Sequence, residues 1–123
     1  MRRRAISILI IALAVALSFW ALPAMKRGLM ARNCLANIKS MGYAASIWSL
    51  EHAGSTPTSW LSLSTELVTP TMMLCPADSS RTAATEWANF VPENTSYELV
   101  GAGGPWGSSN RVFFRCKIHG YVC

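Results

Sequence analysis

Three cysteines and one histidine in the second half of the chain have the side chains and the spacing of a metal site. Cys116 and His119 are separated by two residues, and Cys123 follows His119 after three more. Cys75, which precedes a proline, would supply a fourth ligand. Thiolate sulfur and imidazole nitrogen are the usual ligands of tetrahedral zinc. One interpretation of the pattern is therefore a zinc site made of Cys75, Cys116, His119 and Cys123.

The cysteines also fit a set of disulfide bonds. Four cysteines permit three pairings, and their spacing does not choose among them. A Cys75–Cys116 bridge would close a loop of about 40 residues and stabilise a small domain by roughly 3–4 kcal/mol in the chain-entropy model. Cys34 would then be a buried thiol or the partner of Cys123. Because so many cysteines in a short domain are typical of an oxidising compartment, we favour disulfides over zinc and expect no cofactor.

An apolar segment lies near the beginning of the sequence. Residues Ala5 to Met25 include no charged side chain. As a helix this segment would be roughly 31 Å long, which is enough to cross the hydrocarbon core of a bilayer. The alternative is a cleaved signal peptide, but Leu22 stands where the cleavage zone needs a small residue. We therefore expect an uncleaved anchor over residues 1–25 and a small domain outside the cytoplasm over residues 26–123.

The net charge of +5 is distributed unevenly along the 123 residues. Basic side chains flank the apolar segment on both sides, with Arg2, Arg3 and Arg4 before it. From Ser40 onward, acidic residues outnumber basic ones by six to four. Basic flanks lie where anionic lipid headgroups are found, whereas a nucleic-acid-binding domain would itself be basic. The expected partner is therefore the lipid bilayer and not a nucleic acid.

A long helix is the first element that would position the cysteines. Apolar residues recur at helical spacing along one face: Cys34, Ile38, Met41, Ala45 and Trp48. We therefore predict one helix from about Ala5 to His52, with a transmembrane half and an amphipathic half over about 26–52. Pro23 would bend the helix between the two halves, and Gly54 would end it.

The region 53–123 is expected to form loops, short helices and a small sheet. Short helices are predicted over Trp60–Val68 and Arg81–Phe90. Ser96–Val100 and Arg111–Arg115 are predicted to be the two strands of a hairpin. The predicted fold is therefore α+β, with the long N-terminal helix packed on a small antiparallel β-sheet.

The residue patterns do not favour an enzyme. His52 and His119 have no recognisable nucleophile context, and the six carboxylates are scattered. His52 is explained by a position at the C-terminal end of the long helix. Asp78 is better explained as a helix cap than as a calcium ligand. We expect no catalytic residue and no small-molecule substrate.

Three short motifs are spread along the chain at Cys34–Gly42, Cys75–Asp78 and Arg115–Gly120. In this order they resemble the Cys-x-Asn-Asn-Leu-Lys-Gln-Ile-Gly, Cys-Pro-x-Asp and Arg-Cys-Pro-x-His-Gly elements of pseudopilin-like proteins from Verrucomicrobia and Planctomycetes. The chain is thus similar to the type IV pilin and type II secretion pseudopilin group.

The resemblance implies a pilin-like structural subunit of a type II secretion or type IV pilus-like assembly. Such a subunit is anchored once in the bacterial inner membrane, with a cytoplasmic N-terminus and a periplasmic C-terminal domain. It contacts other pseudopilin-like subunits through its N-terminal helix. The family's Gly-Phe…Glu processing signal is absent, and Arg4–Leu9 stands in its place. The alternative is therefore an anchored periplasmic zinc-binding or interaction module that does not polymerise.

Overall fold

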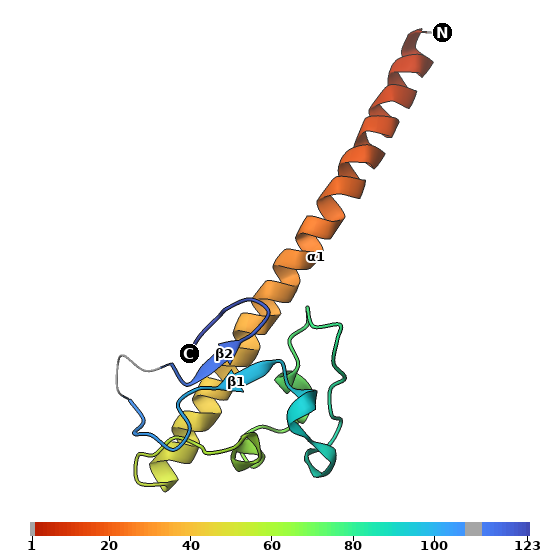
Figure 1. Ribbon diagram of the computed structural model, residues 1–123. Coiled ribbons are helices and arrows are strands. Elements are labelled where there is room, and N and C mark those ends of the chain that lie inside the picture. The colour runs from red at the N-terminus through yellow and green to blue at the C-terminus, as the bar shows by residue number, and fades with distance from the viewer. Residues whose placement is uncertain (1, 108–111) are drawn as a thin grey trace.

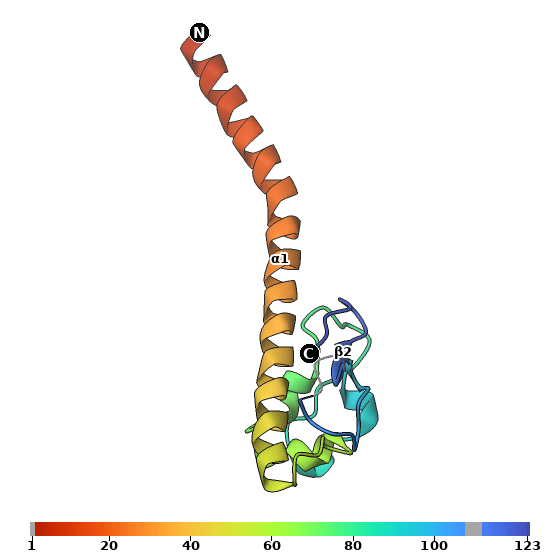
Figure 2. The same cartoon turned by 90° about the vertical axis from the view of Figure 1, so that its left-hand side faces the viewer.

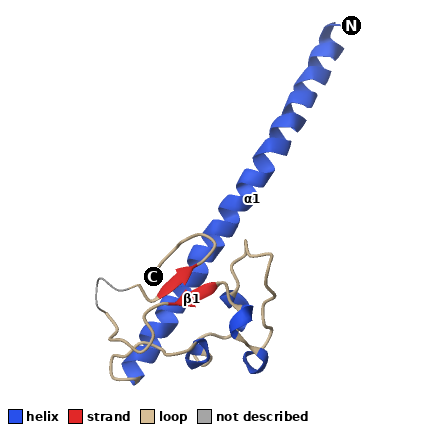
Figure 3. Ribbon diagram, in the orientation of Figure 1, coloured by secondary structure: helices blue, strands red, loops and turns tan. Residues whose placement is uncertain are grey.

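A single long helix dominates the fold. The computed structural model describes residues 2–107 and 112–123. The helix α1 (Arg2–Glu51) is 50 residues long and extends far beyond the small head formed by the rest of the described chain (Figure 1). The other described elements are four short 3₁₀ helices and two strands (Figure 3): η1 (Trp60–Leu63), η2 (Pro70–Met73), η3 (Trp87–Asn89), η4 (Pro92–Asn94), β1 (Tyr97–Leu99) and β2 (Phe114–Cys116). The predicted α+β layout is confirmed.

Between Ile6 and Leu29, the side chains of α1 are not buried by the head. All side chains from Ile6 to Leu29 are exposed, and this part of the helix is long and apolar enough to span a membrane. A helix that is apolar on all sides and unburied in protein is suited to lipid. Pro23 lies inside α1, and the helix changes direction in its N-terminal half (Figure 2). A bend is expected there because proline lacks an amide N–H and clashes with the preceding turn.

The second half of α1 contributes one face to the core of the head. The predicted apolar stripe is confirmed: Cys34, Ile38, Met41 and Ala45 are fully buried, and Trp48 packs against the core. This face meets fully buried side chains from the rest of the head: Leu63, Met73, Tyr97 and Phe114. The helix ends at Glu51, one residue before the predicted His52. The chain then turns at Ala53 and Gly54, which both have positive φ values, and the Gly54 amide donates to the Ser49 carbonyl at 3.0 Å.

The sheet consists of two antiparallel strands that lie beside α1 (Figure 1). Tyr97 pairs with Cys116, and Leu99 pairs with Phe114. Phe114 and Cys116 are buried, whereas Arg115 between them is exposed and pairs with Glu98 at 2.6 Å. This alternation is the period of two that a half-buried strand requires. The sheet therefore presents its apolar face to the helix and directs Cys116 into the core.

The predicted lengths of the shorter elements need correction. Both strands are shorter than expected, and Arg111, which the second prediction included, lies outside the described residues. The helix predicted over Trp60–Val68 is only the single turn η1, and that over Arg81–Phe90 is reduced to η3. Helices of one or two turns have a high nucleation cost, so tertiary contacts decide their extent. Trp87, for example, donates its indole N–H to the Leu67 carbonyl at 2.8 Å.

Candidate metal centre

Four metal-ligand side chains converge beside the second half of α1. Cys34 comes from α1, Cys75 from the loop after η2, Cys116 from the end of β2, and His119 from the turn that follows. Their sulfur and nitrogen ligand atoms all lie within 4.8 Å of one another. A tetrahedral site with metal–sulfur bonds of 2.3 Å separates its ligand atoms by roughly 3.8 Å. The cluster is therefore close to the size of a four-coordinate zinc site.

The histidine ring lies against two of the sulfur atoms. Nδ1 of His119 is 3.3 Å from Cys75 Sγ and 3.8 Å from Cys116 Sγ. The ring also stacks on Tyr121, with centroids 5.4 Å apart. Stacking limits the rotation of the ring, so Nδ1 is held toward the cysteines.

Tight turns place the ligands of the two loops. The Asp78 amide donates to the Cys75 carbonyl at 2.8 Å, and the Gly120 amide donates to the Cys116 carbonyl at 2.9 Å. The turn between Cys116 and Gly120 reverses the direction of the chain, so that His119 faces Cys116. Gly120 has a φ of 70°, a conformation that a residue with a side chain rarely adopts.

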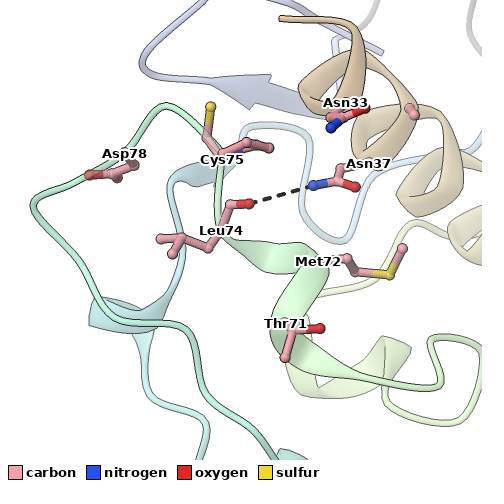
Figure 4. Close-up of a pocket in the computed structure, with 9 residues that line it drawn as sticks. Asn33, Asn37, Thr71, Met72, Leu74, Cys75 and Asp78 are labelled. Atoms are coloured by element: carbon pink, nitrogen blue, oxygen red, sulfur yellow. Dashed lines mark hydrogen bonds between the residues drawn. The ribbon is translucent and has the colours of Figure 1, made fainter. Parts of the chain in front are cut away.

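Hydrogen bonds join the loop of Cys75 to the helix of Cys34. The Asn37 side-chain amide, one turn after Cys34, donates to the Leu74 carbonyl at 3.5 Å (Figure 4). The same amide lies 3.4 Å from the Tyr97 hydroxyl on β1. Asn37 thus connects α1 with the loop and with the sheet at the level of the cluster.

Two sulfur atoms of the cluster accept hydrogen bonds from groups outside the proposed ligand atoms. The Tyr97 hydroxyl donates to Cys34 Sγ at 3.7 Å, and the His119 amide donates to Cys116 Sγ at 3.4 Å. Burial raises the pKa of Tyr97, so its hydroxyl remains protonated and able to donate. Donors of this kind stabilise negative charge on sulfur.

The three cysteines of the cluster are fully buried. Burial raises the pKa of Cys34 to about 12, and it also raises the pKa of Cys75. In the absence of a cation the Cys34 and Cys75 thiols are protonated, because a thiolate in an apolar surrounding lacks the solvation that water gives. A bound metal ion would reverse this preference, since it pairs directly with the thiolate charge.

A buried carboxylate supports the loop of Cys75. Ser96 Oγ accepts a hydrogen bond from the Cys75 amide at 3.0 Å and donates to Asp78 at 2.7 Å. Asp78 also accepts from Ser80 and forms an ion pair with Arg81 at 2.7 Å. The Ser80 and Ser96 hydrogen bonds hold the pKa of Asp78 far below its usual range. Asp78 does not cap a helix over 81–90 as predicted. It orders the Cys75 loop.

Replacement of Asp78 by asparagine is expected to destabilise the head by about 2–3 kcal/mol, because an amide nitrogen would then face hydrogen-bond donors. Thermal unfolding of the detergent-solubilised protein would measure the change. Glu86→Gln is the matched control, since Glu86 is exposed. A D78N protein as stable as E86Q would show that the carboxylate does not support the loop.

The structure corrects one member of the predicted zinc set. Cys75, Cys116 and His119 come together as expected, but Cys34 joins them in place of Cys123. Cys123 Sγ lies beside Gly42, 2.6 Å from where a Cβ would be. Gly42 is eight residues after Cys34, or about 12 Å along the helix. The predicted option of a Cys34–Cys123 bridge therefore does not fit this geometry.

The remaining site predictions have mixed outcomes. The four cysteines are free thiols in the structure, and a Cys75–Cys116 bridge stays a prediction. His52 lies just after the end of α1, as expected, where its ring stacks on Trp48 with centroids 3.6 Å apart. The sequence did contain an indication that Cys34 belongs to the cluster, because its position on the apolar face of the helix directs its side chain into the core. No spacing or motif in the sequence singled out the residues that support the cluster through hydrogen bonds, Asn37, Ser96 and Tyr97.

No family model, curated protein or solved structure matches this chain. The resemblance to pseudopilins therefore rests on the sequence motifs alone.

Proposed function

We propose that this protein is a non-enzymatic structural subunit of a pseudopilin-like assembly of the type II secretion or type IV pilus kind. The observation that supports the proposal is the continuity of α1. One helix contains an exposed apolar segment that could span a membrane and, without interruption, a half that carries a compact head. A subunit built in this way can pack through its helix and display its head at a fixed distance from the membrane.

Two surfaces of α1 are available to neighbouring subunits. In the membrane half, Ala12 and Ala16 lie four residues apart, a spacing of small residues that lets helices approach closely in lipid. In the head half, Tyr43, Ile47 and Leu50 are 73%, 50% and 85% exposed and lie off the buried stripe. A contact between copies along both surfaces would bury apolar area that the single chain leaves exposed.

We place the N-terminus in the cytoplasm and the head in the periplasm of a bacterial inner membrane. The arginine cluster Arg2–Arg4 before the apolar segment favours this orientation. The pseudopilin-like motifs favour the same arrangement. A C-terminal alkaline phosphatase fusion, which is active only outside the cytoplasm, should therefore be active.

Photo-crosslinking in the membranes of the native host tests the assembly. A photoreactive residue at Leu13 or Ile47 is expected to yield adducts of two or more subunits, because Leu13 lies next to Ala12 in the membrane half and Ile47 belongs to the exposed surface of the head half. Glu93 is the control position and should yield far fewer adducts, because it is exposed and lines a surface hollow that contains no residue of α1. If native expression levels give only monomers at all three positions, the protein is a non-polymerising anchored module and the proposal fails.

A further inference from the structure

The cysteine and histidine cluster has a composition that a disulfide does not account for. Three sulfur atoms and one imidazole nitrogen share one small volume, all within 4.8 Å of one another. A single disulfide would use two of the sulfurs and leave a buried thiol and a histidine without a common partner. A tetrahedral ion uses all four atoms.

The surroundings of the sulfur atoms also favour a cation. The sulfurs of Cys34 and Cys116 accept hydrogen bonds from the Tyr97 hydroxyl and the His119 amide. Such donors partly neutralise the excess negative charge of metal-bound thiolates. The sulfur atoms of a disulfide carry no such charge.

We propose that Cys34, Cys75, Cys116 and His119 bind one zinc ion, which fastens the C-terminal part of the head to α1. Soft sulfur ligands with one imidazole in a tetrahedral set select zinc among the common divalent ions. Nδ1 of His119 is the ligand nitrogen, because it faces the sulfurs of Cys75 and Cys116. The four protein ligands fill the coordination sphere. The site is therefore structural, with no position open for a substrate.

The zinc site would connect parts of the chain that are far apart in sequence. Cys34 and Cys75 are 41 residues apart, and Cys116 follows after another 41. Zinc binds cysteine as the thiolate and histidine as the imidazole, so metal binding is coupled to the release of protons. Because the ligands meet only in the folded head, zinc binding stabilises the fold and orders the small sheet against α1.

Metal content of the detergent-solubilised protein tests the proposal. Inductively coupled plasma mass spectrometry is expected to find about one zinc per chain in the wild type and less than about a tenth of that in Cys75→Ser or Cys116→Ser. Cys123→Ser is the matched control, because Cys123 lies outside the cluster, and it should keep its zinc. If C123S loses zinc as C116S does, the ligand assignment is wrong.

The state of the thiols gives a second readout. After chelation under denaturing conditions, alkylation should modify the three cluster cysteines of every chain, as seen in the intact mass. A protein without zinc, in which two of these cysteines resist alkylation until reduction, would overturn the proposal and establish a disulfide. Neither result depends on subunit assembly, so the zinc site and the pseudopilin-like function can fail separately.

Cobalt substitution tests the ligand assignment even if the C75S and C116S proteins do not fold. Wild-type protein and C123S loaded with Co²⁺ should both show the strong visible bands of tetrahedral cobalt and a thiolate-to-cobalt charge-transfer band. Weak octahedral bands in the wild type, or loss of the charge-transfer band in C123S, would contradict the assigned ligands.

Discussion

Replacement of Phe114 by alanine is expected to lower the free energy of unfolding of the head by about 3–5 kcal/mol, the cost of an emptied aromatic site in a packed core. Phe114 is fully buried, and its ring stacks on Trp60 with centroids 5.3 Å apart. It also lies on β2 two residues before Cys116. Because small domains are stable by only about 5–15 kcal/mol, this change removes much of the stability of the head.

Thermal unfolding followed by tryptophan fluorescence in detergent would measure the loss. Ile118→Ala is the control, since Ile118 is 46% exposed, and it should change the stability by no more than about 0.5 kcal/mol. An F114A protein within about 1 kcal/mol of the wild type would show that the sheet and helix do not share one core.

Paired arginines in the membrane half of α1 are expected to abolish stable membrane insertion. Leu13 and Leu17 are exposed and lie near the middle of the apolar segment. An arginine near the bilayer centre costs about 2.5–3.5 kcal/mol on insertion scales, so Leu13→Arg with Leu17→Arg costs about 5–7 kcal/mol. The double variant should be released from membranes by alkaline carbonate, as immunoblotting of the pellet and supernatant would show.

The same helix provides a matched control for this experiment. Ile47→Arg with Leu50→Arg places two arginines at exposed positions of the head half of α1. This protein should remain in the membrane pellet, because the apolar segment is unchanged. If the L13R/L17R protein also remains in the pellet, that segment does not span the bilayer.

The elements governed by local sequence were predictable. The apolar segment of α1 follows from the run without charge between Ala5 and Met25, since the transfer of a helix into lipid depends on its own side chains. The buried face with Cys34 and Ile38 follows from helical spacing, because residues three or four apart share one side of a helix. The end of α1 near Gly54 likewise depends on local backbone conformation.

The membership of the cysteine cluster was decided only by the tertiary structure. Spacing grouped Cys116, His119 and Cys123 because they are close in sequence, but the turn at Gly120 and the bridge between Arg115 and Val122 carry Cys123 along the helix to Gly42. Cys34 takes its place because α1 and β2 pack together. The sequence by itself thus determined the helix, its apolar segment and its buried face. The cluster needed the folded head, because residues about 40 positions apart become neighbours only when the whole core closes.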